Sequence, residues 1–189
     1  FADEVHLVKE FPPAAEYNTI TLTRAFKGKL YFIHQVYYFY NLMVSDGTEE
    51  STQLVKQIGA DGSHTGFVEV DEHLFIAEES QGFAGYIHKS DGTTAGTQEF
   101  HDLVNEYYFT DGLDWVNLTA TDDMLYFVDN TGVMSNEYPY ENNFQLFRTD
   151  QTLQNPRSLE SIYGISLEGT DNVTAAEANS VFFTTQWLD

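Results

Sequence analysis

Short apolar runs separated by polar turns recur three times along the chain. The runs begin at Leu30, Leu74 and Leu125 and read Leu-Tyr-Phe-Ile, Leu-Phe-Ile and Leu-Tyr-Phe-Val. Continuous apolar runs of this length predict strands that are buried on both faces. A segment with apolar residues at alternating positions precedes each run, and this period of two predicts half-buried strands at 19–23, 67–70 and 116–119.

Each apolar run leads into a third strand that ends at an aspartate, Asp46, Asp91 or Asp150, and a fourth strand follows. The pattern returns after roughly 45 to 60 residues with no helical periodicity inside it, which favours four strands per unit. The predicted fold class is all-β, a β-propeller or a propeller-like array of four-stranded antiparallel blades. A single repeat domain is expected over residues 1–189, with units at 18–58, 66–103 and 116–162 and partial units at 1–11 and 172–189.

The two partial units leave the overall organisation open. Residues 5–11 are similar to the fourth strand of the first unit, and residues 173–184 are similar to the first two strands. Strands from the two ends could complete one shared blade and close a small ring of roughly four blades. Alternatively, the sequence is an excerpt of a longer repeat array.

The aspartate that ends each third strand has a structural interpretation. An aspartate side chain accepts hydrogen bonds from backbone N–H groups two residues on, and glycine adopts a positive φ without strain. A threonine hydroxyl adds a further bond. We therefore expect Asp46, Asp91 and Asp150 to shape turns, with a ligand or metal role as the alternative.

The best-preserved corner, Lys89 to Thr97, reads Lys-Ser-Asp-Gly-Thr-Thr-Ala-Gly-Thr. It resembles the repeat of a bacterial family of secreted and surface proteins whose units carry ELWKSDGTxxGT. The first unit has Ser51 in place of the second glycine, and the third unit has Asp150-Gln151-Thr152. Met43, His88 and Phe147 occupy the position of the family's tryptophan. The resemblance implies propeller-like repeats and an extracellular or cell-surface location in a bacterium, and it implies no catalytic activity.

The charge balance excludes several kinds of partner. The chain has 30 acidic and 8 basic residues and a formal net charge of −22, so it lacks the basic clusters that nucleic acids and anionic membranes attract. No apolar stretch is long enough for a membrane span, so membrane insertion is not expected. The absence of cysteine excludes disulfides and thiolate metal sites. The acidity suits a solvated surface, or alternatively Ca²⁺ or a cationic partner.

Two acidic segments are weak candidates for a calcium site. Asp111 and Asp114 fall in one, and Asp129 and Asn130 fall in the other. Both provide oxygen ligands on segments expected to be loops, which suits Ca²⁺ better than zinc, but neither has the spacing of an EF-hand. Ca²⁺ is the one cofactor that the sequence suggests.

No arrangement of residues predicts catalysis. The carboxylate pairs 71–72, 78–79 and 122–123 are expected in turns or loops, where neighbouring side chains point apart into water. The sequence contains no nucleophile elbow, P-loop or dinucleotide-binding fingerprint. The protein is therefore predicted not to be an enzyme.

Aromatic loop residues are the best candidates for ligand binding. Such rings beside carboxylates suit the C–H faces of sugars and equally suit protein partners, although they could instead fill gaps between blades. The candidates are Tyr37, Tyr38, Tyr40, Tyr108, Trp115, Tyr138 and Tyr140.

The sequence thus favours a non-enzymatic extracellular binding, adhesion or scaffolding module of a larger protein or assembly. Its expected partner is a glycan or a protein. A propeller domain of a carbohydrate-active enzyme and a purely structural spacer are the alternatives.

Overall fold

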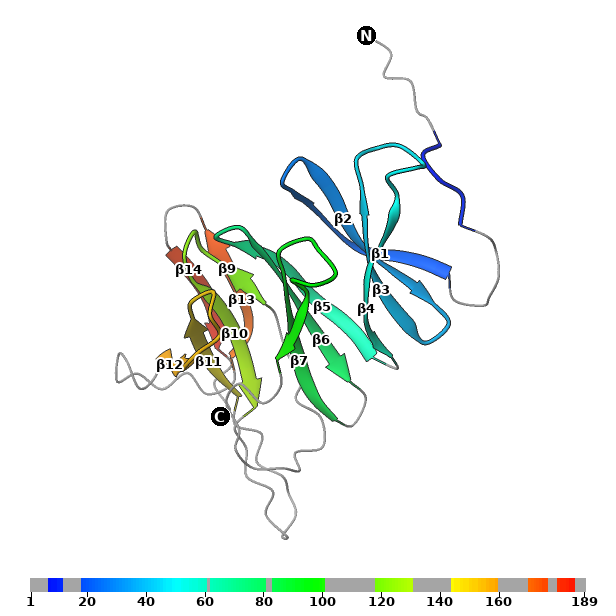
Figure 1. Ribbon diagram of the computed structural model, residues 1–189. Coiled ribbons are helices and arrows are strands. Elements are labelled where there is room, and N and C mark those ends of the chain that lie inside the picture. Colours follow the sequence, from blue (N-terminus) through cyan, green and yellow to red (C-terminus); the bar gives the residue numbers. More distant parts are fainter. Residues whose placement is uncertain are drawn as a thin grey trace.

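The computed structural model describes residues 7–11, 18–60, 62–80, 83–100, 118–130, 144–159, 170–176 and 180–185. All the elements whose bounds the structure defines over these ranges are β-strands, so the predicted all-β class is confirmed. The strands form three four-stranded antiparallel sheets and one two-stranded sheet, which follow one another along the chain (Figure 1).

Within each four-stranded sheet the strands lie in chain order, as the repeated pattern predicts. The first sheet contains β1 (Asn18–Phe26), β2 (Lys29–Val36), β3 (Phe39–Ser45) and β4 (Gln53–Ala60). The second sheet contains β5 (Gly62–Val70), β6 (His73–Ser80), β7 (Phe83–Ser90) and β8 (Gln98–Phe100). The third sheet contains β9 (Thr119–Ala120), β10 (Leu125–Asn130), β11 (Phe144–Thr149) and β12 (Arg157–Ser158), and the last contains β13 (Thr170–Ala176) and β14 (Ser180–Thr185).

Tight turns join the first two strands of a sheet. Phe26 pairs with Lys29, so the β1–β2 turn consists of Lys27 and Gly28, and their φ angles are 49° and 73°. Two positive φ angles define the primed hairpin turn whose twist matches that of the flanking strands. The β5–β6 turn also begins with a positive φ, 49° at Asp71. The turn predicted at 71–72 is therefore confirmed, and the β1–β2 connection is a tight polar turn of the same kind.

The second strands of all four sheets share one register. Leu30 pairs with Ala25 and Val181 pairs with Ala175, and an aromatic residue stands one position further along each second strand. The equivalent aromatic residues are Tyr31, Phe75, Tyr126 and Phe182.

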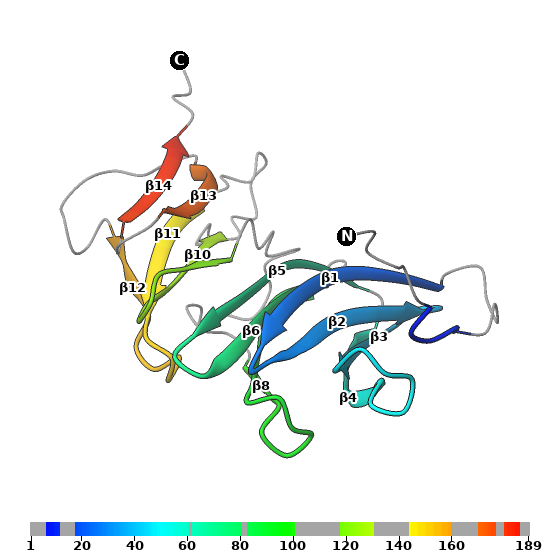
Figure 2. The same ribbon diagram turned by 90° about the horizontal axis from the view of Figure 1, so that it is seen from above.

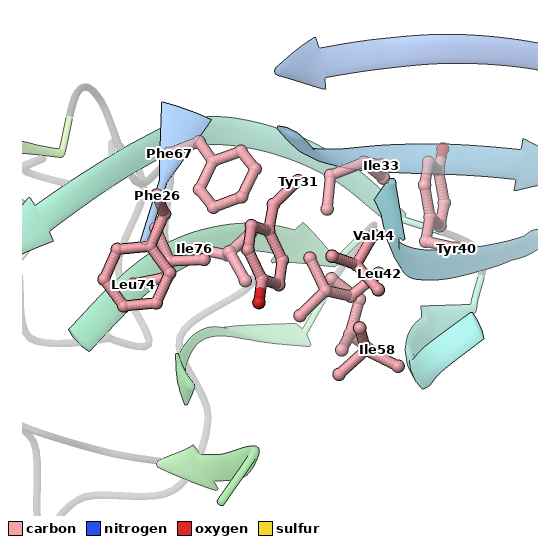
Figure 3. Packing of buried hydrophobic residues seen from close by; sticks show 11 residues of the cluster. Phe26, Tyr31, Ile33, Tyr40, Leu42, Val44, Ile58, Phe67, Leu74 and Ile76 are labelled. Atoms are coloured by element: carbon pink, nitrogen blue, oxygen red, sulfur yellow. The ribbon is translucent and has the colours of Figure 1, made fainter. Parts of the chain in front are cut away.

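The interface between the first and second sheets contains a hydrophobic core (Figure 3). The first sheet contributes Tyr31, Ile33, Leu42 and Val44, among others, and the second sheet contributes Phe67, Leu74 and Ile76. Leu42, Leu74 and Ile76 have no exposed surface. Burying one such side chain stabilises the fold by about 1.5–3 kcal/mol, so this interface holds the two sheets together.

The interface between the second and third sheets repeats this arrangement. Phe75 and Ile87 come from the second sheet, and Leu125, Phe127 and Phe147 come from the third. The rings of Phe127 and Phe147 stack with their centroids 5.6 Å apart. As in the first interface, the earlier sheet contributes the aromatic residue of the shared register, here Phe75. The later sheet contributes the two residues that flank its own aromatic position, here Leu125 and Phe127.

Each sheet therefore has two distinct faces, because successive side chains of a strand point to opposite sides. We call the face with Tyr31 or Phe75 the back face, and the face with Leu74 and Ile76, or with Leu125 and Phe127, the front face. Back faces pack on the front face of the next sheet. β13 contacts β9, β10 and β11 of the third sheet. The first and last sheets lie at opposite ends of the row (Figures 1 and 2).

Candidate functional site

An aspartate carboxylate organises each of the three corners that follow the third strands. We name residues 45–52, 90–97 and 149–156 the first, second and third corner. In each, one carboxylate oxygen accepts hydrogen bonds from the backbone N–H and the hydroxyl of the threonine two residues on. The pairs are Asp46 with Thr48 (3.1 and 2.8 Å), Asp91 with Thr93 (2.8 and 2.7 Å) and Asp150 with Thr152 (2.8 and 2.5 Å). The structural interpretation of the three aspartates is confirmed.

These hydrogen bonds stabilise the ionised carboxylates. The pKa of Asp91 lies below its ordinary value because the Thr93 hydroxyl and N–H donate to it, and the pKa of Asp150 is lowered in the same way by Thr152. The pKa of Asp46 is lowered chiefly by the hydroxyl of Ser51, then by Thr48. Ser51, which stands where the second corner has Gly96, thus adds a donor to the first corner.

A hydroxyl pair ties the two ends of a corner together. Ser45 Oγ lies 2.7 Å from Thr52 Oγ1, and Ser90 Oγ lies 2.7 Å from Thr97 Oγ1. In the third corner the equivalent of Ser45 is Thr149, whose buried hydroxyl has no hydrogen-bond partner within the described residues. Proline stands at position 156, where the other corners have threonine, so the third corner lacks one half of the pair.

Lysines of one sheet hold the corner of the next. Lys56 Nζ on β4 donates to the carbonyl oxygen of Thr97 at 2.6 Å, and Lys89 Nζ on β7 donates to that of Gln151 at 2.6 Å. Thr94 Oγ1 returns a bond to the carbonyl oxygen of Val55 at 2.7 Å. The corners therefore join neighbouring sheets.

Tyr31 fits against the second corner at Gly92. Gly92 has a φ of 94°, and a Cβ built there would overlap Tyr31 Oη. Burial and the nearby negative charge of Asp91 raise the pKa of the Tyr31 hydroxyl. Glycine is thus required at position 92 for two reasons. A side chain would strain the positive φ, and it would also collide with the Tyr31 ring.

A buried carboxylate–imidazole pair lies in the second sheet. Glu78 Oε2 is 2.8 Å from His88 Nε2, and both side chains are almost fully buried. A Cβ built on Gly59 of β4 would overlap the Glu78 carboxylate. The interpretation of residues 78–79 as solvated carboxylates in a turn is wrong for Glu78, which continues the buried strand β6 at the position of His34 in β2. That continuation of the apolar run could have revealed it.

The predicted tyrosines of the first sheet divide into two environments. Tyr37 and Tyr38 form the β2–β3 turn and have exposed fractions of 48% and 62%, and Phe39 beside them is 47% exposed. Tyr40 is 7% exposed and belongs to the core between the first two sheets. The alternation of a strand explains the division, because Tyr40 faces inward from β3. Tyr40 therefore does not contribute to the exposed surface.

Tyr37 has an uncommon backbone conformation. Its φ is 56°, in the left-handed region where glycine, asparagine and aspartate are favoured. Gln35 Nε2 donates to the Tyr37 carbonyl oxygen at 3.2 Å and fixes the turn. A bulky residue held in this region marks a position worth testing for function.

The remaining candidates are not brought together in the described residues. Tyr108, Trp115, Tyr138, Tyr140, Asp111 and Asp114 lie outside them. Asp129 and Asn130 belong to β10, where they pair with Gln145 and Phe144, so their expected loop placement is wrong. Over the described ranges no group of three or more histidine or acidic side chains could hold a metal ion, and the calcium site stays a prediction.

Two further findings bear on the class of protein. In the part of the chain that the structure describes, no helix has the length and hydrophobicity required to cross a membrane. Comparison with protein-family models, with curated proteins and with solved structures found no match to this chain.

Proposed function

We propose that the chain is a non-enzymatic binding module whose row of sheets presents the exposed aromatic turn Tyr37–Phe39 to a partner. The observation that carries the proposal is the combination of three exposed aromatic side chains with a left-handed Tyr37. When a partner covers exposed aromatic side chains, their removal from water contributes favourably to the free energy of binding. Such side chains suit a sugar ring or a protein surface.

In this proposal the four-stranded sheets are blades of a propeller-like array in an extracellular or surface-attached bacterial protein. The array serves as a rigid support. Its second corner is engaged in joining the first two sheets, because the Asp91 carboxylate and the Ser90 hydroxyl bond within the corner and the Thr97 carbonyl oxygen accepts from Lys56. Recognition is therefore assigned to the β2–β3 turn of the first sheet, which lies apart from the corners.

The experiment compares binding of the purified chain to arrays of immobilised glycans and extracellular proteins. The test variant combines Tyr37→Asn with Tyr38→Ser. Asparagine tolerates a positive φ, so the turn is expected to keep its shape and the protein its thermal stability. Lys27→Asn is the matched control, since Lys27 has a φ of 49° in the neighbouring primed turn.

Wild type and Lys27→Asn are expected to bind at least one class of probe, and the double variant is expected to lose that binding. Binding to a glycan or to a protein on the arrays identifies the class of partner. Equal binding by wild type and the double variant, or no binding to either array, would contradict the proposed function.

A further inference from the structure

Within the part of the chain that the structure describes, the front face of the first sheet is open where the same face of the second sheet is covered. Leu30 of β2 is 45% exposed, whereas Leu74, its equivalent in β6, is completely buried. Ile20 of β1 is 52% exposed on the same groove. The groove has a volume of about 400 Å³, and its lining includes Leu30, Phe32, Thr23 and Gly47.

Residues 7–11 lie beside the first sheet, at one of the positions that the strands of a preceding sheet would take. Lys9 Nζ donates to the carbonyl oxygen of Thr52 at 2.8 Å, and this repeats the bond from Lys56 on β4 to Thr97 in the second corner. Phe11 packs on Phe32 and His34, with ring centroids 6.3 and 4.1 Å apart. The segment therefore lies where the fourth strand of a preceding sheet would lie.

Among the described residues, no aromatic ring packs on the glycine of the first corner as Tyr31 packs on that of the second. Gly47 and Gly92 have nearly the same conformation, with φ angles of 98° and 94°. A Cβ on Gly92 would meet Tyr31, whereas a Cβ on Gly47 would meet nothing within 4 Å. A complete interface would place an aromatic residue over Gly47.

We propose that a second copy of this chain fills the groove with its last sheet, β13–β14, so that copies associate head to tail. Phe182 of β14 holds the register position of Tyr31, and in the described residues this sheet has only two strands. Residues 7–11 of the receiving copy would serve as its fourth strand. The inference goes beyond the proposed binding function and does not depend on the Tyr37–Phe39 turn.

Position favours a second copy over the same copy, and charge suits the last sheet as the occupant of the groove. The first and last sheets lie at opposite ends of the row (Figures 1 and 2), so one chain does not bring them together. The charged residues of the groove lining are two lysines, Lys9 and Lys29, and one acidic residue, Asp46, whereas residues 170–189 contain acidic residues and no lysine or arginine. Such an interface joins two different surfaces, so it builds a chain or ring of copies.

The test measures the mass of the purified chain by analytical ultracentrifugation from about 1 to 100 µM, a range that detects micromolar association. Wild type is expected to form a concentration-dependent series of oligomers. Leu30→Lys blocks the groove and Phe182→Asp blocks the last sheet, so each variant alone is expected to remain monomeric, with association weakened at least about tenfold. Tyr38→Lys, a change at a more exposed position outside the groove, is expected to associate like wild type.

Mixing the two variants provides the decisive test of head-to-tail association. Leu30→Lys retains an intact last sheet and Phe182→Asp retains an intact groove, so an equimolar mixture is expected to form a one-to-one dimer and nothing larger. Dimer formation also establishes that both variants fold. A monomeric wild type at about 100 µM, or oligomers that both variants leave unchanged, would overturn the proposal. Loss of association with retained array binding separates it from the proposed function.

Discussion

The ammonium group of Lys56 on β4 lies 2.6 Å from the carbonyl oxygen of Thr97, in the corner of the neighbouring sheet. The contact joins two parts of the chain that are adjacent in space but not in sequence. Because Lys9 makes the same contact with Thr52, it belongs to the way in which successive units pack.

Replacing Lys56 by methionine is expected to lower the free energy of unfolding by about 1–2 kcal/mol, because a partly buried carbonyl loses a charged donor while the apolar stem is kept. Chemical denaturation measures the change. Lys29→Met, which removes an exposed lysine of β2, is expected to change the free energy by less than about 0.5 kcal/mol. Equal effects of the two substitutions would show that the Lys56 contact contributes little.

Thr149→Val is expected to leave the protein as stable as wild type or stabilise it by up to about 1 kcal/mol. The Thr149 hydroxyl is buried with no partner within the described residues, so its removal relieves an unmet desolvation cost. Ser90→Ala is the comparison, since Ser90 Oγ bonds Thr97 Oγ1, and it is expected to cost about 1 kcal/mol. Thermal unfolding of both variants checks the opposite signs, and a loss of stability in Thr149→Val would contradict this account of the third corner.

Gly59→Ala is expected to destabilise the protein by about 1–3 kcal/mol, because the added methyl group overlaps the Glu78 carboxylate and disturbs its bond to His88. A double-mutant cycle with Glu78→Ala isolates this cause. In the Glu78→Ala background the alanine at position 59 should cost less than about 0.5 kcal/mol. If the full cost persists there, another contact is responsible.

Asp91→Asn is expected to reduce the acid sensitivity of folding. The pKa of Asp91 is depressed in the folded protein, so its ionised form stabilises the fold above the ordinary aspartate pKa of about 4. This contribution is lost as the pH falls from that value through the folded-state pKa. Asparagine keeps the side-chain acceptor and does not titrate.

The difference in unfolding free energy between wild type and Asp91→Asn, measured from pH 7 to pH 3, separates this effect from the general relief of charge repulsion in a chain of net charge −22. The two proteins should converge as the pH falls. A constant difference over that range would mean that the corner does not hold the ionised form preferentially.

Much of the framework could be predicted from sequence because it depends on local patterns. The apolar run at Leu30–Ile33 and the turn residues at Asp46–Thr48 specify strands and corners within a few residues. The contacts between units could not be predicted in this way. Tyr31 meets Gly92 and Gly59 makes room for Glu78 only after two sheets pack, and no local periodicity records that approach.

The aromatic candidates show the same limit. Tyr37, Tyr38 and Tyr40 form one run in the sequence, but one residue of strand alternation separates an exposed turn from the core. The expected loop placement holds for Tyr37 and Tyr38, while the side that each ring faces depended on the register of β2 with β3.

The measurement that tests the packing of successive units most directly compares Gly92→Ala with Gly47→Ala by equilibrium unfolding. Both glycines have a φ near 95°, so both substitutions incur a backbone strain of about 1–2 kcal/mol. Only Gly92 lies against a ring from the neighbouring sheet, so Gly92→Ala should cost about 1–3 kcal/mol more than Gly47→Ala. The comparison is made at a protein concentration where the chain is monomeric. Equal losses of stability in the two variants would contradict the account.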